Sequence, residues 1–421
     1  MHDDVNAVRI QVARQVAHWR AAVIALADLD NFASPDAWRR LEQYLSTSLR
    51  TNLRGAVDRL VRESDVLAAE LRAADTLDEL ELVRRHVVRF RRRFLRVETG
   101  LEFYGDAVND RSSPKLGALL SACDILAGRA LDSILTPLGK PVPPVLTYVD
   151  KGLGASIMRA GLRLWDGRTL SAAAAIKLTR HNLNGRPTAL LHEAGHQIAF
   201  TLGWNDELAE VLRRELRDDP ELATVWSGWS SEIAGDCVGF VYAGYAAVAA
   251  LHDVIAGEAV GVYAMRPFDP HPIAHLRVLL GTAMATRFFG EGPWTDLSKA
   301  WLVAHPVARA PGDVRSLIER SLPRLPRIAE ICLLEPMRAF AARPLTALVD
   351  PMRVRPDALA ALARDAGASL GISSHWLWGE SLRLLALSGY RLATEPDRAP
   401  EIATQFEAWM LRLGNSVQVA A

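Results

Sequence analysis

Two histidines and a glutamate near the middle of the chain have the spacing of a metal-dependent hydrolytic site. His192 and His196 are four residues apart, with Glu193 between them, in the pattern His-Glu-x-x-His. Residues i and i+4 share one face of an α-helix, so both imidazoles can bind one ion while the Glu193 carboxylate reaches a water activated by it. Neutral imidazoles suit zinc, and a catalytic zinc site has three protein ligands and one open position. We therefore expect Zn2+ as the cofactor, His192 and His196 as ligands, and Glu193 as the general base.

A glutamate farther along the chain is the candidate for the third ligand. One large class of such sites continues as H-E-x-x-H-x-x-G-x-x-H, but the glycine and the last histidine are replaced here by Ala199 and Leu202. The other common solution is a glutamate from a following helix. Glu232 and Asp236 are four residues apart among apolar neighbours. We expect Glu232 to bind the metal and Asp236 to accept the other ring N–H of a ligand histidine, His192.

The order of these motifs resembles that of a known enzyme family. H-E-x-x-H followed by Glu-x-x-x-Asp-x-x-Gly resembles the gluzincin metallopeptidases, and the segment from His271 to Arg277 is similar to the His-Pro-x-x-x-x-Arg segment of the CAAX prenyl protease type. The motifs cover residues 175–280. We expect His271 and Arg277 to be catalytic, either stabilising the oxyanion formed during peptide attack or closing the cleft. The alternative for Arg277 is a structural ion pair with Asp236 or Glu232.

The residues of the metal motif require a helix, and a small sheet is expected before it. The sequence predicts a helix that starts at Pro187 and stops at Gly203. The segment 145–149 has the β-branched and aromatic content of a strand, and further candidate strands lie at 155–165 and 173–180. The resemblance implies that the strand just before the motif helix forms the edge of the cleft, where an extended peptide can add as another strand.

Both ends of the chain read as helical. Apolar positions recur at helical spacing through residues 1–140, with breaks that indicate three to five helices, and residues 291–421 are again helical with proline breaks. The predicted fold class is therefore α+β and predominantly helical. A zincin-like catalytic core with a small sheet is expected at residues 141–290, flanked by the helical N-terminal and C-terminal regions.

Composition limits the partners and the location. The 421 residues carry 49 Lys and Arg and 49 Asp and Glu, so the zero net charge gives no reason to expect nucleic-acid binding. Cys123, Cys237 and Cys332 are widely spaced among apolar residues, which is typical of reduced core thiols in a cytoplasmic protein. The N-terminus lacks a signal pattern, although secretion by a non-classical route stays open. The longest apolar run, 238–251, is too short to span a membrane and predicts a buried helix.

Together these features predict a soluble zinc-dependent metalloendopeptidase that acts on a peptide or protein substrate. Two alternatives remain. In one, the zinc only holds the central region together, His271 fills the fourth coordination position, and the helical regions bind a protein partner. In the other, the peptidase is latent, with an open zinc site and a blocked cleft, until a partner or ligand switches it on.

Overall fold

The chain forms two compact units. The computed structural model describes residues 2–45, 49–152, 154–161, 171, 173–183, 187–266 and 269–416. One unit comprises residues 1–113 and 160–173, and the other comprises residues 114–159 and 174–421. This division differs from the three regions expected from the sequence, because residues 141–159 and 174–290 share a unit with residues 291–421. The described elements are predominantly helical with a small mixed sheet, which confirms the predicted α+β class.

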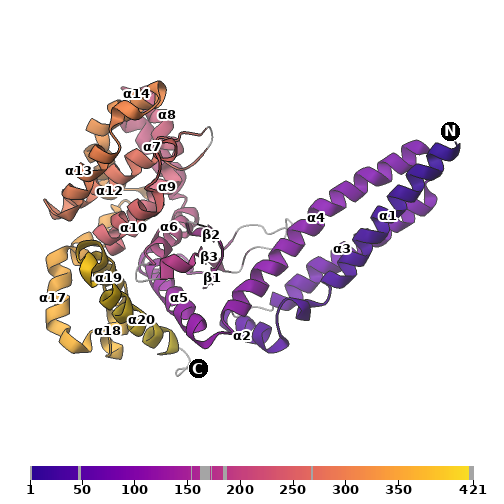
Figure 1. Ribbon diagram of the computed structural model, residues 1–421, viewed down its shortest axis with the longest axis horizontal. Coiled ribbons are helices and arrows are strands. Elements are labelled where there is room, and N and C mark those ends of the chain that lie inside the picture. Colours follow the sequence, from indigo (N-terminus) through magenta and orange to yellow (C-terminus); the bar gives the residue numbers. More distant parts are fainter. Residues whose placement is uncertain are drawn as a thin grey trace. The chain divides into compact units, whose positions relative to one another are not determined.

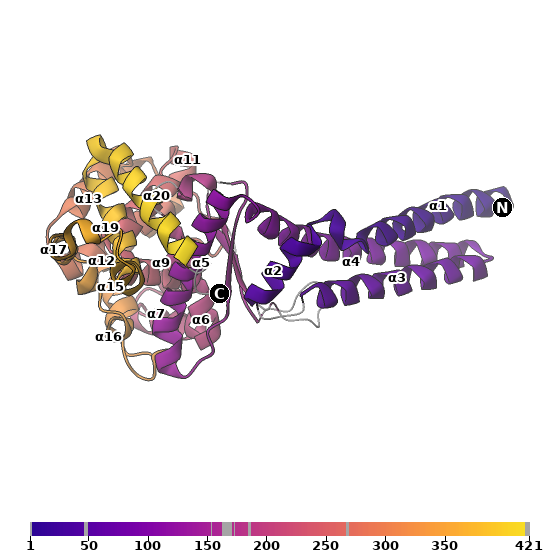
Figure 2. The same ribbon diagram turned by 90° about the horizontal axis from the view of Figure 1, so that it is seen from below.

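The first unit is a helical bundle. Its α-helices are α1 (His2–Leu26), α2 (Pro35–Leu45), α3 (Leu49–Ala73) and α4 (Leu77–Asp110), with a 3-10 helix η1 (Leu29–Asn31). α1, α3 and α4 lie side by side (Figures 1 and 2) and bury apolar residues at helical spacing, such as Val87 and Phe94 of α4. Thr76 and Glu79 start α4 with a reciprocal capping box. The arginine-rich stretch of α4 is partly neutralised within the helix, since Glu81 pairs with Arg84.

The second unit contains the remaining helices and the sheet. Its α-helices are α5 (Pro114–Leu135), α6 (Ala189–Leu202), α7 (Trp204–Glu215), α8 (Pro220–Gly228), α9 (Ser230–Ala243), α10 (Tyr245–Ile255), α11 (Ala259–Val262), α12 (Ala274–Phe289), α13 (Pro293–Ala304), α14 (Gly312–Ser321), α15 (Leu325–Leu334), α16 (Leu345–Leu348), α17 (Pro356–Ala366), α18 (Ser374–Gly379), α19 (Ser381–Thr394) and α20 (Ala399–Ser416). Its 3-10 helices are η2 (Thr136–Leu138), η3 (Arg180–Leu183), η4 (Val307–Arg309), η5 (Leu322–Arg324), η6 (Arg338–Phe340), η7 (Pro351–Val354), η8 (Gly367–Ser369) and η9 (Pro396–Arg398). α6 packs on α9, and α5 packs on both α6 and α20 (Figures 1 and 2). α5 therefore belongs to the core of this unit, although the sequence pattern groups it with the N-terminal helices.

The sheet lies beside α6 and differs in one respect from expectation. Strands β1 (Val145–Val149), β2 (Ser156–Met158) and β3 (Ala174–Leu178) are arranged in the order β1-β3-β2. β3 pairs in parallel with β1 and antiparallel with β2. The prediction that the strand at 173–180 forms the edge of the cleft is therefore wrong, because both edges of β3 are paired. β2 is the outer strand on that side, and the part of the predicted strand 155–165 from 162 onward lies outside the described residues.

The long apolar run 238–251 forms parts of two helices and not one. α9 ends at Ala243 and α10 begins at Tyr245, with Gly244 between them at φ 56°. This left-handed conformation suits glycine, and a Cβ at Gly244 would lie 3.2 Å from the backbone oxygen of Val354. Among the described residues, the structure contains no helix with the length and apolar character needed to cross a bilayer.

Candidate metal centre

Helix α6 carries the His-Glu-x-x-His motif and ends before Gly203 as predicted, although it starts slightly later than Pro187. It begins at Ala189 and ends at Leu202. Gly203 follows in a left-handed conformation at φ 68°, and its N–H donates to the carbonyl oxygens of the last turn. This geometry places His192 and His196 on one face, with ring centroids 4.6 Å apart.

Glycines allow α9 to approach α6 closely enough to share a site with it. A Cβ at Gly195 of α6 would lie only 2.9 Å from the Cα of Gly235 and from the Cβ of Val238. A Cβ at Gly235 would lie 2.7 Å from Cε1 of His192. Real Cβ atoms essentially never approach so closely, so both positions require glycine. The close approach brings the carboxylates of α9 to the imidazoles of α6.

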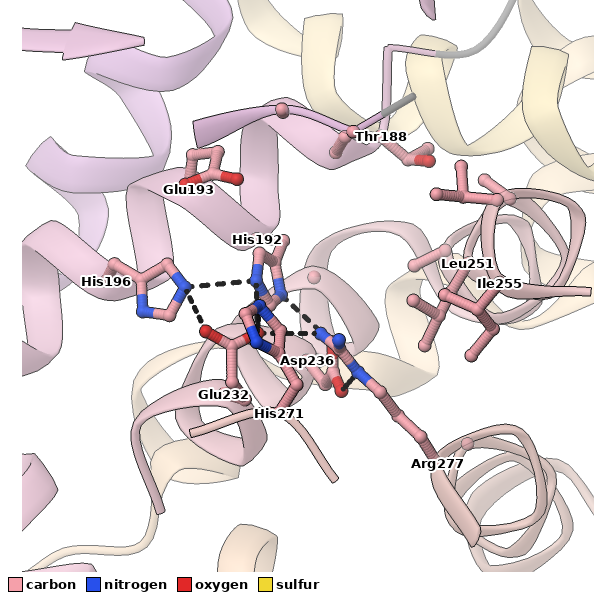
Figure 3. Close-up of a pocket in the computed structure, with 18 of the residues that line it drawn as sticks. Thr188, His192, Glu193, His196, Glu232, Asp236, Leu251, Ile255, His271 and Arg277 are labelled. Atoms are coloured by element: carbon pink, nitrogen blue, oxygen red, sulfur yellow. Dashed lines mark hydrogen bonds and ion pairs between the residues drawn. The ribbon is translucent and has the colours of Figure 1, made fainter. Parts of the chain in front are cut away.

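The structure brings the three expected ligands together. Ligand atoms of His192, His196 and Glu232 all lie within 4.8 Å of one another. The two Nε2 atoms are 3.1 Å apart, and the Glu232 carboxylate oxygens lie 3.4 Å from His192 Nε2 and 3.3 Å from His196 Nε2 (Figure 3). All three side chains are mostly buried, with exposed fractions of 18%, 11% and 9%. This is a compact donor set of two imidazole nitrogens and one carboxylate.

A second pair of charged residues holds this donor set in place. Asp236 Oδ1 lies 2.9 Å from Nδ1 of His192, the histidine that the sequence assigns to it. Arg277 of α12 donates from Nε to Asp236 Oδ2 at 2.6 Å and from Nη2 to Oδ1 at 2.8 Å. Its Nη2 also lies 3.2 Å from Glu232 Oε2. Such outer partners fix the orientation and tautomer of ligand side chains. Arg277 therefore forms the ion pair expected as the alternative, while a direct catalytic role for it stays a prediction.

The charges in this cluster favour the ionised form of Glu232, which suits a cation, and the protonated form of His192, which a metal must displace. Burial opposes ionisation of Glu232, but the hydrogen bonds with His192 and His196 and the charge of Arg277 hold its pKa well below its usual range. Burial lowers the pKa of His192, yet Asp236 and Glu232 outweigh this and raise it to about 10. A metal binds only the neutral imidazole, so metal binding at this residue is accompanied by proton release.

Glu193 lies beside the donor set without belonging to it. Figure 3 shows its carboxylate outside the ligand group, on the adjacent position of α6. The residue is only 6% exposed, and burial raises the pKa of its carboxyl. Within the described part of the chain, no hydrogen bond or ion pair engages this carboxylate. A buried carboxyl with a raised pKa is suited to accept and return a proton near neutral pH.

His271 faces the cluster from the segment before α12. Its Nδ1 lies 2.6 Å from Asp269 Oδ1, and its Nε2 lies 3.5 Å from Glu232 Oε2. Its side chain is 57% exposed, so it has room to meet a bound substrate. Asp269 was not among the residues expected from the sequence, where its only signal is that a carboxylate stands two residues before a candidate histidine. His275, farther along the chain, is fully buried, and its Nε2 donates to the carbonyl oxygen of His305, so it does not face the cluster.

The donor set opens into a pocket of about 490 Å³. β2 and the residues on either side of it line one part, including Ser156 and Arg159. Apolar residues of α10 and α12 line another part, including Val248, Leu251 and Met284. Pockets of this volume, with apolar walls and a few converging polar groups, are typical of small-molecule and substrate sites. Nothing in the sequence around Arg159 indicates that this residue reaches the pocket.

Comparisons with protein-family models, with curated proteins and with solved structures found no match for this chain. The choice of metal and of chemistry therefore depends on the donor set. Two imidazoles and one carboxylate are a common ligand set of catalytic zinc, and the same set holds Fe(II) in oxygenases. The carboxylate of Asp236 beside His192 is compatible with either metal. The buried carboxyl of Glu193 next to the donors is the kind of group that hydrolysis needs.

Replacing the third ligand should weaken metal binding. We expect Glu232→Ala to lower the zinc affinity by more than about 100-fold, because the loss of a direct ligand exceeds the roughly 10–100-fold cost of losing an outer partner. Competition with a chromophoric chelator measures the affinity, and Glu319→Ala, at an exposed glutamate of α14, is the matched control. An unchanged affinity would assign the third ligand elsewhere, with Asp236 as the next candidate.

Proposed function

We propose that this protein is a zinc-dependent metalloendopeptidase that hydrolyses peptide or protein substrates, with Glu193 as the general base. The observation that carries the proposal is the buried carboxyl of Glu193, which shares one pocket with the donors of His192, His196 and Glu232. The resemblance of these motifs to gluzincin metallopeptidases points to the same reaction.

Each group has a role in peptide hydrolysis. Zinc, when bound, supplies a Lewis acid that polarises the scissile carbonyl and lowers the pKa of the attacking water. Glu193 accepts the proton of that water and returns it to the leaving amine. His271 donates from Nδ1 to Asp269, and when both ring nitrogens carry protons it can also donate from Nε2 to the carbonyl oxygen as negative charge develops there. Asp236, fixed by the two hydrogen bonds of Arg277, keeps His192 in the orientation for binding.

The outer strand of the sheet supports an extended substrate. Among the described residues, β2 pairs only with β3, so its other edge offers backbone groups to an added strand. β2 also lines the pocket through Ser156 and Ile157. Main-chain pairing gives affinity with little demand on sequence, and a peptide bound in this way can extend past the site in both directions. We therefore propose internal cleavage, with β2 in the role first expected of β3.

The non-catalytic alternative requires a fourth protein ligand. His271 is the candidate, but it is not among the described residues whose ligand atoms group within 4.8 Å, and its side chain is more than half exposed. This arrangement supports a site with an open position. Cys123, Cys237 and Cys332 are buried, and no disulfide joins them within the described residues, which supports the proposal of a cytoplasmic location.

A peptide pool tests the proposal directly. The zinc-loaded full chain is incubated with a diverse set of peptides, the products are read by mass spectrometry, and the bound metal is determined in the same sample. We expect internal cuts that a chelator abolishes and that added zinc restores. Zinc bound without any cut would favour the non-catalytic or latent alternative, and a preference for iron over zinc would contradict the proposed chemistry.

A further inference from the structure

One face of α6 runs along the whole site. Thr188, His192, His196 and Phe200 follow one another at intervals of four residues, so they form a row that runs obliquely along the helix, each turned by about 40° from the one before. The first three line the pocket. At about 1.5 Å per residue, Phe200 lies about 12 Å along the helix axis from His192. The row therefore gives the site two distinguishable ends, with the metal donors between them.

The end near Thr188 is apolar. A Cβ at Gly239 would lie 3.7 Å from Cβ of Ala247 and 3.9 Å from the backbone nitrogen of His192, which places the start of the α10 wall at this end of α6. Figure 3 shows Leu251 and Ile255 of α10 on the side of Thr188 and away from His196. A substrate group bound here meets aliphatic side chains.

The end beyond His196 carries a positive charge. Arg159 follows β2 directly and lines the pocket. Its guanidinium carbon lies over the ring of Phe200, 5.1 Å from the centroid, and Phe200 is 37% exposed. No hydrogen bond or ion pair of Arg159 is present within the described ranges. By contrast, the other arginine of the pocket, Arg277, is held by Asp236.

We propose that Arg159 binds a carboxylate of the substrate, so that this site selects peptides with an acidic group on the His196 side of the scissile bond. The inference rests on the proposed peptidase function. The cation–π contact with Phe200 holds the guanidinium at this end of the site, and its N–H groups have no hydrogen-bond or ion-pair partner within the described residues. A planar guanidinium matches a carboxylate with two parallel hydrogen bonds. The carboxylate belongs either to an Asp or Glu side chain or to a free C-terminus, and both present the same chemistry to Arg159.

Matched peptides test this assignment. One series has the same sequence around the scissile bond and carries Glu, Gln or Lys on the His196 side, each with a free or an amidated C-terminus. We expect wild type to cut the acidic peptides about tenfold faster in kcat/KM, the size that a charge-assisted hydrogen bond gives. Arg159→Glu should reverse the preference toward Lys. Arg213→Glu makes the same charge change at an exposed position of α7 and should retain the wild-type preference.

Binding to an inactive variant separates this inference from the proposed function. The same peptides are titrated into the zinc-loaded Glu193→Gln protein, with and without Arg159→Glu. If amidation of the C-terminus lowers the affinity, Arg159 binds the C-terminal carboxylate. If replacement of Glu by Gln in the peptide lowers the affinity, Arg159 binds the acidic side chain. If wild type cuts or binds acidic and neutral peptides equally, or if Arg159→Glu leaves the preference unchanged, the assignment of Arg159 is wrong while the peptidase stands. If acidic peptides bind more tightly but wild type cleaves none of them, the assignment of Arg159 holds and the proposed peptidase function is wrong.

Discussion

Glu193→Gln is expected to abolish most peptide hydrolysis while zinc binding is retained. An amide cannot accept the proton of the attacking water, and general acid–base catalysis contributes about 10²–10⁴-fold to such rates. Glu193 is not among the grouped ligand donors, so the metal affinity should not fall. Burial raises the pKa of this carboxyl, so a neutral amide of the same shape is no harder to bury and stability should be maintained.

Three measurements on one preparation check this prediction. They are the rate of cleavage of a peptide found in the pool, the zinc content after removal of free metal, and the denaturant midpoint. Glu319→Gln on α14 makes the same chemical change at an exposed site and should behave as wild type. A Glu193→Gln protein with full activity would refute the assignment of the general base.

Arg277→Met is expected to destabilise the second unit by about 3–5 kcal/mol, because removal of one partner leaves a buried charge without compensation. Arg277 is 7% exposed and holds Asp236 through two hydrogen bonds. The same change should weaken zinc binding by about 10–100-fold, since Asp236 then no longer fixes the His192 ring. The side chain of methionine is flexible and fills much of the volume of the arginine stem. The loss of stability is therefore due to the missing charge more than to lost packing.

Denaturant unfolding of chelator-treated protein measures this effect, because bound metal would add its own stabilisation. Arg213→Met on α7 is the matched control for an exposed arginine. The double variant of Arg277→Met with Asp236→Leu should lose less free energy of unfolding than the two single variants lose together, as expected for charges that compensate each other. A loss below about 1 kcal/mol for Arg277→Met would show that solvent screens the pair as it does on a surface.

The sequence by itself determined the local geometry of the site. The spacing of four residues placed His192 beside His196, and the same spacing placed Glu232 on one face of its helix with Asp236. The stop at Gly203 followed from the left-handed conformation that glycine adopts without strain. These features depend on helical periodicity and on the conformational range of single residues. Both are properties of short segments, so they can be read before any packing is known.

Only the tertiary structure decided which segments meet. The segment 173–180 has the composition of a strand, but its central place in the sheet depends on the pairing of β3 with β1 and β2. Likewise, Arg159 is 41 residues before Phe200 (200 − 159), and nothing in its neighbours shows that it lies over that ring. Residue periodicity tells which face of an element is apolar, but not which element covers it. That choice is made by packing and charge compensation between segments that are distant in the sequence, as in the pairing of Arg277 with Asp236.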